Sequence, residues 1–350
     1  MSIVREMLKP LAEDGAALTR EQARAVLAAM LDGEATEVEA AGLLTALATR
    51  GELAPELAGF VEEMRARATP IPLSEEERQE LVDTCGTGGG GPATFNISTG
   101  AALVAAAAGA KVAKHGNRAV TSRCGSADVL EALGVPIALP PDMAAECLRE
   151  TGFVFLLATM LHPAMKAMAP LRHALGFRTI FNLCGPLTNP AHARAQVIGV
   201  LAPSRALLVA RTLIELKTTR SAFVVHGLDG LDELTLTGES IAVRVEPAAE
   251  PAIKAARVTP EMAGLPRAEL EELSGGDAND NAIILYDILT GIPGPRRDIV
   301  LFNAAAALVA AGLAADLKEG VARGAEAIDS GEAAVTLQKL RLFQQKWSGE

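Results

Sequence analysis

The segment from Leu81 to Asp128 constrains the fold of this chain more than any other stretch of its sequence. A short apolar strand is predicted at Glu80–Asp83, and it runs into a glycine-rich turn over Gly86–Gly91. An alanine-rich helix follows, and a second strand is predicted around Lys111–Ala113. Glycine adopts positive φ at no steric cost and lets a backbone approach a ligand closely. The pattern therefore predicts a strand–turn–helix–strand unit whose turn lies against a bound group.

The charges in this segment indicate that the bound group is an anion. No acidic residue lies between Asp83 and Asp128, although the formal net charge of the whole chain is −11. The basic residues of the segment are Lys111, Lys114, Arg118 and Arg123. Polar side chains also stand at the expected helix start, where N–H groups and the helix dipole favour an anion: Asn96, Ser98 and Thr99. We therefore predict a cleft that concentrates a phosphorylated ligand.

Two common nucleotide-binding motifs do not account for the glycines. Gly86, Gly88 and Gly91 satisfy the G-x-G-x-x-G spacing, but a dinucleotide fold also needs an acidic residue about 20 positions later. This chain has none before Asp128. No Gly-Lys-Ser or Gly-Lys-Thr follows the turn, so a Walker-type phosphate loop does not fit either.

Composition narrows the class of protein. An acidic balance with only 3% aromatic residues disfavours nucleic-acid binding, which needs clustered Lys and Arg. The first residues are too charged for a signal sequence, and the longest apolar run, Ile299–Ala315, is too short to span a bilayer. The 4 cysteines show no C-x-x-C spacing, which favours reduced thiols. We predict a cytoplasmic protein without nucleic-acid or membrane partners, and a buried helix at Ile299–Ala315.

The N-terminal residues 1–68 read as a separate helical unit. Capping-box patterns at Thr19–Gln22 and Thr36–Glu39 predict two of its helix starts. Prolines after Ala68 mark a linker. No residue of this unit suggests chemistry, so we interpret it as a packing or dimerisation unit.

From about residue 70, strands alternate with helices in the rhythm of a mainly parallel sheet. Glu233–Thr237 and Ile241–Val245 are predicted to form an antiparallel pair joined through Gly238. The segment His162–Asn189 interrupts the rhythm, and a helix is predicted within it at Pro163–Leu175.

Several sequence blocks, in one order along nearly the whole chain, resemble the anthranilate phosphoribosyltransferases. They are Asp83-Thr-Cys-Gly-Thr-Gly-Gly, Thr94-Phe-Asn-Ile-Ser-Thr, Lys114-His-Gly-Asn-Arg, Gly125-Ser-Ala-Asp-Val-Leu-Glu, Arg178-Thr-Ile-Phe-Asn-Leu-Cys-Gly-Pro-Leu-Thr-Asn-Pro and His226-Gly-Leu-Asp-Gly-Leu-Asp-Glu. The resemblance implies transfer of the phosphoribosyl group of 5-phosphoribosyl 1-diphosphate to anthranilate, with release of pyrophosphate, in tryptophan biosynthesis.

The resemblance also implies a fold and a domain division. The expected fold is of the nucleoside phosphorylase and phosphoribosyltransferase class, α/β, with a small helical N-terminal domain and a larger domain whose mainly parallel central sheet is flanked by helices. Residues 1–68 would be rejoined by about 163–190 to form the helical domain. Residues 70–162 and 191–350 would form the domain that binds phosphoribosyl diphosphate. A homodimer through the helical domain is expected.

The residues matching the family's motifs imply three subsites. Those for diphosphate and ribose are Gly86, Thr87, Gly89, Gly90, Thr94, Asn96, Ile97, Ser98, Thr99, Lys114, His115, Gly116, Asn117 and Ser126. Those for anthranilate are Gly86, His115, Asn117, Arg172, Gly185 and Pro186, with Arg172 as the fork for its carboxylate. Those for Mg²⁺, the implied cofactor, are Ser98, Asp232 and Glu233. No acid or base is assigned, because an aryl amine is already a neutral nucleophile and positioning carries much of the rate.

Two positions depart from the family pattern. Gly90 stands where the family usually has an acidic residue, which removes one anchor for a metal ion or its waters. Cys124 stands where the family tends to have Ser, and a thiol donates hydrogen bonds poorly. Two alternatives remain open: a pyrimidine nucleoside phosphorylase, and a non-catalytic homologue that binds phosphorylated metabolites. Asp232-Glu233 and the block Asn182–Pro190 favour the transferase over the phosphorylase.

Overall fold

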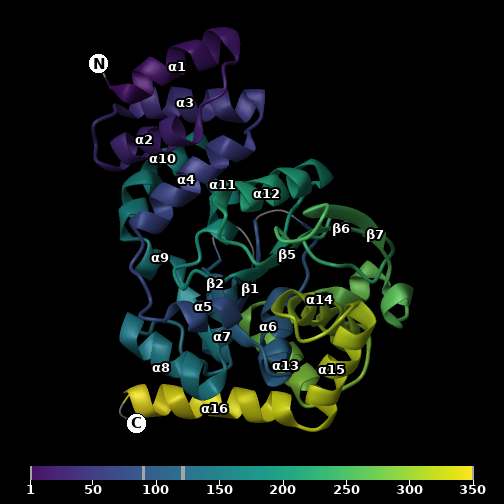
Figure 1. Cartoon of the computed structure of the whole chain (residues 1–350). Coiled ribbons are helices and arrows are strands. Elements are labelled where there is room, and N and C mark those ends of the chain that lie inside the picture. Colours follow the sequence, from purple (N-terminus) through teal and green to yellow (C-terminus); the bar gives the residue numbers. More distant parts are fainter. Residues whose placement is uncertain (1, 89–90, 120–122, 349–350) are drawn as a thin grey trace.

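A helical bundle lies at one end of a larger α/β body in the computed structural model (Figure 1), which describes all residues except 1, 89–90, 120–122 and 349–350. The bundle comprises α1 (Ile3–Asp14), α2 (Arg20–Leu31), α3 (Glu37–Arg50) and α4 (Ala54–Ala66). Thr19 and Thr36 each accept a hydrogen bond from the third residue of the helix that follows, and that residue's side chain bonds back. Both predicted capping boxes are thus confirmed.

A seven-stranded sheet forms the centre of the larger body, in the order β3-β2-β1-β4-β5-β6-β7. Its strands are β1 (Leu81–Gly86), β2 (Lys111–Gly116), β3 (Phe153–Leu157), β4 (Ala195–Gly199), β5 (Ser221–Gly227), β6 (Ser240–Val245) and β7 (Ile253–Val258). The pairs among β1 to β5 are parallel, whereas β6 and β7 run antiparallel. The predicted mainly parallel sheet is confirmed, with β1 beginning one residue later than expected and reaching Gly86.

Helices cover both faces of this sheet (Figure 1). The helices of the larger body are α5 (Glu75–Glu80), α6 (Ile97–Ala107), α7 (Ser126–Ala132), α8 (Pro141–Thr151), α12 (Pro203–Leu216), α13 (Ala278–Leu289), α14 (Pro295–Ala311), α15 (Leu317–Asp329) and α16 (Glu332–Ser348). Of these, α13, α15 and α16 pack on other helices. Helices α6 and α14 pack together on one face, and α12 packs between β5–β6 and α4 on the other. Every residue from Ile299 to Ala310 is buried, which confirms a buried helix there, although the helix ends at Ala311 and not at the predicted Ala315.

The segment between β3 and β4 consists of short elements. They are α9 (Ala158–Leu161), η1 (Pro163–Met168), α10 (Ala169–Leu175), α11 (Phe181–Cys184) and η2 (Gly185–Leu187). The last of these contains Gly185 and Pro186, two of the residues predicted to bind anthranilate. The single helix predicted at Pro163–Leu175 is therefore wrong. Its first half is a 3₁₀-helix and an α-helix begins afresh at Ala169, because Pro170 has no N–H with which to continue an earlier ladder. Two more 3₁₀ turns follow β7, η3 (Pro260–Ala263) and η4 (Leu270–Leu273).

The predicted pairing of Glu233–Thr237 with Ile241–Val245 is also wrong. β6 pairs instead with β5 and β7. The backbone of the earlier segment is engaged by side chains: Asn303 bonds both the N–H and the carbonyl oxygen of Leu234, and Ser240 Oγ accepts the Thr235 N–H. The segment is therefore a buried loop, which places Asp232 and Glu233 beside the end of β5.

Two hydrophobic cores lie on the two sides of the sheet. One includes α6 and α14, and the other joins α12 and the sheet face beneath it to the N-terminal helices. All four cysteines are buried, and none of them forms a disulfide. Within the described part of the chain, no helix combines the length and the apolar character needed to cross a membrane.

Candidate active site

The glycine-rich turn lies at the carboxyl ends of the parallel strands, where open α/β sheets bind ligands. A Cβ built on Gly86 would lie 2.4 Å from Asp232 Oδ2, so any side chain at this position would displace the carboxylate. Gly88 has a φ of +62°, and its N–H donates to the same oxygen at 3.4 Å. The Thr87 N–H donates to the Gly199 carbonyl oxygen at 2.9 Å. Two further predicted glycines fall outside the described residues: Gly89 and Gly90.

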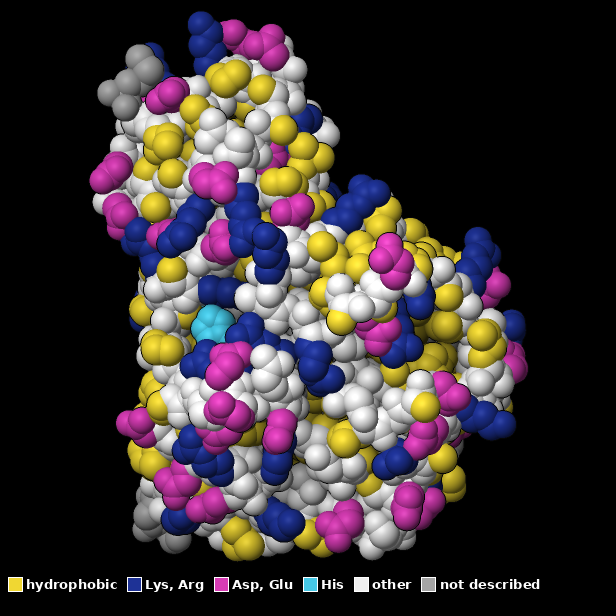
Figure 2. Space-filling model, viewed as in Figure 1, with side chains coloured by type: hydrophobic (Ala, Val, Ile, Leu, Met, Phe, Trp, Pro, Cys, Tyr) yellow, Lys and Arg dark blue, Asp and Glu magenta, His cyan; other side chains and the backbone are white. Residues whose placement is uncertain are grey.

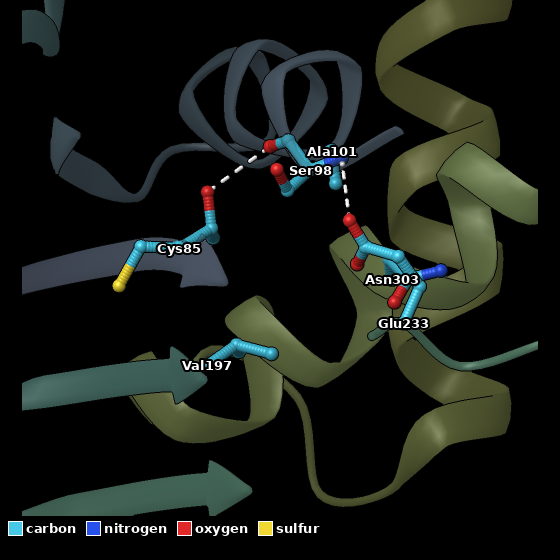
Figure 3. Close-up of a pocket in the computed structure, with 7 residues that line it drawn as sticks. Cys85, Ser98, Ala101, Val197, Glu233 and Asn303 are labelled. Carbon is cyan, nitrogen blue, oxygen red and sulfur yellow. Dashed lines mark hydrogen bonds between the residues drawn. The ribbon is translucent and has the colours of Figure 1, made fainter. Parts of the chain in front are cut away.

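The first turn of α6 meets the acidic residues that follow β5. The Ser98 N–H donates to Glu233 Oε1 at 3.1 Å (Figure 3). The Thr99 hydroxyl is buried and has no hydrogen-bond partner among the described residues. Ile97 lies in the core, so only its backbone is placed to meet a ligand. The helix start thus brings polar groups from two distant parts of the sequence together.

Asn96 precedes α6 but does not cap it with its side chain. Its Nδ2 donates to the Cys124 carbonyl oxygen at 3.3 Å, and its Oδ1 accepts from Asn281 Nδ2 at 2.9 Å. Asn281 is a buried residue of α13 that the sequence did not single out. Thr94, the first residue of its predicted motif, forms an isolated bridge with Ser274. The residues just before α6 are thus held in place by Cys124, Ser274 and Asn281, which lie outside the motif that begins at Thr94.

Asp232 and Glu233 are adjacent, partly buried carboxylates. Burial raises the pKa of Asp232 above its ordinary value. Burial, and then the neighbouring Asp232, raise the pKa of Glu233 to about 8. Glu233 also borders a cavity of about 10 Å³ with Ser98 and Asn303 (Figure 3). Two carboxylates so close together and so poorly solvated are poised to receive a cation.

The donor set here suits Mg²⁺ and disfavours metals that prefer His or Cys ligands. Across the described residues there is no cluster of three or more His, Cys, Asp or Glu side chains able to enclose a metal ion. Two carboxylates and the Ser98 hydroxyl are hard oxygen donors that would fill only part of an octahedral shell. Mg²⁺ commonly takes one or two carboxylates and completes its shell with waters and substrate phosphates.

Lys114 is a buried cation beneath the start of α6. Its Nζ donates to the Thr84 carbonyl oxygen and lies 3.4 Å from Ser98 Oγ. Burial lowers the pKa of Lys114, and the negative charge of Asp83 and, less strongly, that of Glu233 oppose this shift. The side chain therefore holds positive charge close to the groups predicted to meet a diphosphate.

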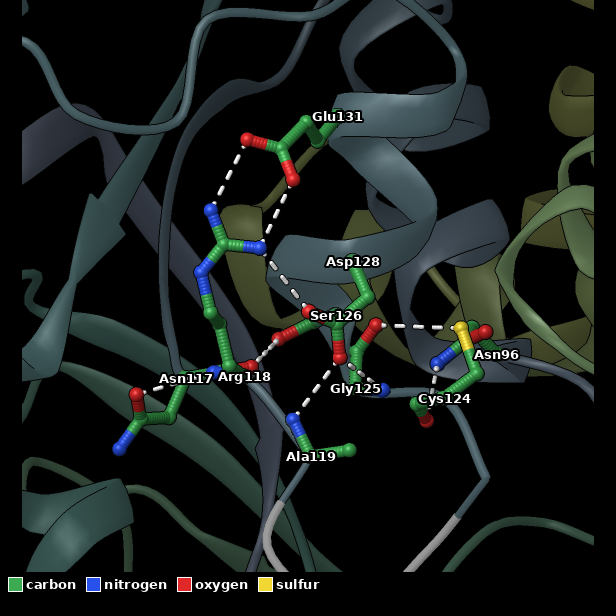
Figure 4. Close-up of polar contacts among 9 residues, drawn as sticks. All are labelled: Asn96, Asn117, Arg118, Ala119, Cys124, Gly125, Ser126, Asp128 and Glu131. Atoms are coloured by element: carbon green, nitrogen blue, oxygen red, sulfur yellow. Dashed lines mark hydrogen bonds and ion pairs between the residues drawn. The ribbon is translucent and has the colours of Figure 1, made fainter.

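The other basic residues of the segment contribute less than the sequence suggested. Lys111 is exposed at the opposite end of β2, and Arg118 forms ion pairs with Asp128 and Glu131 (Figure 4). The predicted basic island thus contributes Lys114 at the strand ends, whereas Lys111 and Arg118 are directed elsewhere. Other basic side chains, however, gather along the junction of the helical bundle with the larger body (Figure 2).

The residues after β2 form a tight corner with the start of α7 (Figure 4). Ser126 Oγ donates to the Asn117 carbonyl oxygen at 3.3 Å. A Cβ on Gly116 would lie 2.4 Å from Ser126 Oγ, so this position requires glycine. Asp128 Oδ2 accepts the N–H groups of Ala119 and Gly125, both at 2.9 Å. The corner thus brings Gly116, Asn117 and Ser126 together, and their role in binding diphosphate and ribose stays a prediction.

The residues predicted to line the anthranilate pocket on β2 and on η2 are in contact with each other. His115 Nδ1 lies 3.1 Å from the Gly185 carbonyl oxygen. The Pro186 carbonyl oxygen accepts from Gln196 Nε2 at 2.8 Å. The His115 ring lies 5.1 Å from the ring of His162, centroid to centroid, and His115 Nε2 and both His162 nitrogens are buried without a described partner. From the sequence we expected His162 to be a structural residue, and its proximity to His115 was not predicted.

Arg172 lies on α10 and is exposed. Its guanidinium carbon is 5.5 Å from the centroid of the Phe181 ring, a cation–π contact. Within the described residues it makes no ion pair, so the guanidinium is free to bind an anion. Among the same residues, no hydrogen bond joins Arg172 directly to His115 or Gly185.

A buried network that the sequence did not reveal holds this wall in place. Asp83 is fully buried, and its carboxylate accepts from the His115 N–H at 3.0 Å and from Asn189 Nδ2 at 2.8 Å. Asn189 Nδ2 also donates to the Ala113 carbonyl oxygen. Burial raises the pKa of Asp83, while these hydrogen bonds favour its charged form. The network ties the segment carrying Gly185 to β1 and β2.

The buried histidines predict acid sensitivity. Burial lowers the pKa of His115 to about 3 and that of His162 to about 4. An unfolded histidine takes up its proton near pH 6.5, so the native state loses stability as the pH falls from there toward these values, by about 1.4 kcal/mol per pH unit for each histidine. We expect His162→Gln to flatten the pH dependence of the free energy of unfolding between pH 6.5 and 4.5, measured by urea titration.

His173, which is exposed on α10, supplies the control. His173→Gln should leave the acid sensitivity of the wild type in place. Parallel curves for wild type and His162→Gln would show that His162 is not held neutral in the folded protein.

Comparisons with known proteins agree over the whole chain. A family model described as "Glycosyl transferase family, helical bundle domain" matches residues 5–68, and one described as "Glycosyl transferase family, a/b domain" matches residues 78–334. The anthranilate phosphoribosyltransferase of Moorella thermoacetica is 50% identical over 334 residues, covering 95% of this chain and 96% of that protein. That of Symbiobacterium thermophilum is 47% identical over 347 residues, covering 99% of each.

Solved structures are similar over the same length. The anthranilate phosphoribosyltransferase of Thermus thermophilus has a TM-score of 0.89 at 44% identity, covering 99% of this chain and 100% of that chain. The enzyme of Saccharomyces cerevisiae in complex with PRPP and Mg has a TM-score of 0.88 at 26% identity, covering 98% of each chain. The same yeast protein has also been solved in complex with 4-fluoroanthranilate.

Proposed function

Because the chain belongs to the anthranilate phosphoribosyltransferase family, we propose that the site at the carboxyl ends of β1, β2, β4 and β5 carries that family's reaction. The protein transfers the 5-phosphoribosyl group of 5-phosphoribosyl 1-diphosphate to the amine of anthranilate and releases pyrophosphate, with Mg²⁺ as its cofactor. The observation that carries the assignment of the site is the meeting of Asp232 and Glu233 with the glycine turn and the start of α6.

The diphosphate side of the site acts on the leaving group. As the bond between ribose and pyrophosphate breaks, negative charge grows on the pyrophosphate, and preorganised N–H groups and cations stabilise it. We assign this role to the glycine turn, the first turn of α6 and Lys114. Asp232, Glu233 and the Ser98 hydroxyl would hold Mg²⁺, which when bound neutralises charge on the diphosphate oxygens.

The anthranilate side of the site orients the acceptor. We assign the carboxylate of anthranilate to Arg172, whose planar guanidinium suits a bidentate pair. His115, Asn117, Gly185 and Pro186 would line the pocket that holds the ring. With a pKa of about 3, His115 is neutral at physiological pH, which supports a role in lining the pocket. The aryl amine needs no strong base, so orientation of the two substrates supplies much of the rate.

We also propose the domain division and the assembly. Residues 1–68 with about 163–190 would form the helical domain, and the rest would form the α/β domain. A direct contact between the two segments supports this division, since the rings of Phe60 in α4 and Phe181 in α11 lie 5.7 Å apart. We propose that the protein forms a homodimer through the helical domain and that it is located in the cytoplasm. The 81% exposure of Val38 on α3 is compatible with an interface there.

Loss of anthranilate fluorescence tests the proposed function directly. The purified protein should consume anthranilate only when phosphoribosyl diphosphate and Mg²⁺ are both present, with pyrophosphate formed in equal amount. Phosphate-dependent release of uracil or thymine from a nucleoside would identify a phosphorylase instead. Binding of phosphoribosyl diphosphate without consumption of anthranilate would identify a non-catalytic homologue.

Arg172→Ala should raise the KM for anthranilate by roughly 10- to 100-fold, the worth of a charge-assisted hydrogen bond. The KM for phosphoribosyl diphosphate should stay near its wild-type value, because Arg172 belongs to the acceptor side. Steady-state kinetics with each substrate varied in turn measures both constants. The matched control is His173→Ala, which removes the exposed neighbour on α10 and should change neither. An unchanged KM for anthranilate in Arg172→Ala would refute the assignment.

A further inference from the structure

Asn303 is a polar exception in a buried apolar helix. Helix α14 is buried at every position from Ile299 to Ala310, and Asn303 is the only polar residue in that stretch. The side chain is 2% exposed. Burying an amide among apolar groups is costly unless all its hydrogen bonds are made. The position therefore needs an explanation beyond packing of the core.

The amide of Asn303 makes three hydrogen bonds, and two of them clamp one residue. Its Oδ1 accepts the Leu234 N–H at 2.9 Å, and its Nδ2 donates to the Leu234 carbonyl oxygen at 2.9 Å. Nδ2 also donates to the Ile299 carbonyl oxygen one helical turn earlier, at 2.9 Å. The side chain thus pairs with Leu234 as a neighbouring strand would, although the loop there belongs to no strand.

Leu234 directly follows the acid pair, so the clamp fixes the backbone from which Asp232 and Glu233 project. Glu233 and Asn303 border the same small cavity (Figure 3). On the other side, a Cβ on Gly199 would lie 1.7 Å from the Asp232 carbonyl oxygen, so β4 also confines the loop closely. The loop is held between the end of β4 and α14, with Leu234 itself fully buried.

We propose that Asn303 is the positioning residue that aims Asp232 and Glu233 at the cation of the substrate complex. This inference rests on the proposed function, because it takes these two carboxylates as the ligands of Mg²⁺. Groups that orient metal ligands from behind typically contribute 10- to 100-fold to metal affinity. Asn303 does so through the backbone of the loop, because its three hydrogen bonds go to Leu234 and Ile299.

The test measures binding of Mn²⁺, a paramagnetic substitute for Mg²⁺, in the presence of inorganic pyrophosphate, by electron paramagnetic resonance. Asn303→Leu keeps the volume of the side chain but removes all three hydrogen bonds. We expect its Kd for Mn²⁺ to rise roughly 10-fold or more. The concentration of Mg²⁺ needed for half-maximal rate should rise with it, whereas the KM for anthranilate should not. High Mg²⁺ should restore much of kcat.

Thr212→Val separates positioning from loss of stability. Thr212 is a fully buried polar residue of α12 whose hydroxyl bonds within its own helix, to the Leu208 carbonyl oxygen. Thr212→Val should lower Tm and leave the Kd for Mn²⁺ unchanged. If Asn303→Leu does not fold, Asn303→Ser is used, because its hydroxyl can still bond Ile299 but cannot reach both groups of Leu234.

The possible outcomes distinguish failure of this inference from failure of the proposed function on which it rests. A folded Asn303 variant whose Kd for Mn²⁺ lies within twofold of the wild-type value would overturn the positioning role while leaving the acid-pair site intact. A wild-type protein that binds no Mn²⁺ with pyrophosphate, or binds it equally well after Asp232→Asn, would overturn the acid-pair site and the inference together.

Discussion

Replacing Asp232 with Asn and Glu233 with Gln in one variant should lower kcat about 1,000-fold, a loss of roughly 4 kcal/mol of transition-state stabilisation. Both replacements keep the shape of the side chain and remove its charge. Pyrophosphate would then depart without the charge neutralisation that we assign to Mg²⁺ held by these carboxylates. The remaining rate should respond weakly to Mg²⁺ between micromolar and millimolar concentrations. Initial rates of anthranilate consumption across a Mg²⁺ titration measure both effects.

Folding of this double variant should not be impaired, and its pH dependence provides the check. With a folded pKa of about 8, Glu233 keeps a proton between pH 4.5 and 8 that the unfolded chain releases. Without metal, the wild type therefore loses stability as the pH rises through this range. Glu233→Gln removes this loss, so the double variant should unfold at a urea concentration no lower than that of the wild type at pH 8.

A surface carboxylate provides the matched control for the rate. Glu239 lies a few residues beyond the loop and is paired with Arg257 at the surface. Glu239→Gln changes the net charge of the region without touching the site, and it should keep both kcat and the Mg²⁺ response of the wild type. If the double variant also kept them, Asp232 and Glu233 would have no part in catalysis.

The sequence predicted the architecture where local chemistry determined it. Capping boxes at Thr19 and Thr36, the apolar runs of the strands and the long apolar stretch before Ala315 each have a local physical cause, and the structure has those elements. The errors arose where distant residues compete for a backbone. Leu234 is bound by Asn303, 69 positions away, and a pattern within the loop could not show that.

The candidate site was predicted as a set of residues but not as an arrangement. Ser98 and Glu233 are 135 positions apart, and Asp83 and Asn189 are 106 positions apart. Only the order of strands in the sheet brings such pairs together, because strands whose carboxyl ends share one edge deliver their loops to the same place. Charge was misread for the same reason: Arg118 looked unopposed in a segment without acids, yet α7 turns back and supplies Glu131. Asn303 was visible as a polar residue in an apolar run, which is the signal that would have identified it.

Lys114→Met should lower kcat/KM for phosphoribosyl diphosphate about 100- to 1,000-fold, or roughly 3 to 4 kcal/mol, because the charge-assisted contacts of a buried cation are lost. Methionine matches the unbranched side chain of lysine and removes its charge. In the proposed complex the substrate would bring its negative charge to the first turn of α6, where Lys114 Nζ lies 3.4 Å from Ser98 Oγ. The KM for anthranilate, measured at saturating phosphoribosyl diphosphate, should change little.

Lys111 and Arg118 separate a local effect from a change in overall charge. Lys111→Met removes a cation from the same strand, but at its exposed, distant end, and Arg118→Met removes one already paired with acids. A field that merely attracts anions would weaken in all three variants and would be screened by salt. A buried contact would be lost in Lys114→Met alone and would persist at high ionic strength. Similar losses of kcat/KM in the three variants would therefore show that Lys114 acts by general attraction of anions and does not bind the diphosphate directly. A loss of kcat/KM confined to Lys114→Met would show that the Lys114 ammonium contacts the pyrophosphate leaving group directly.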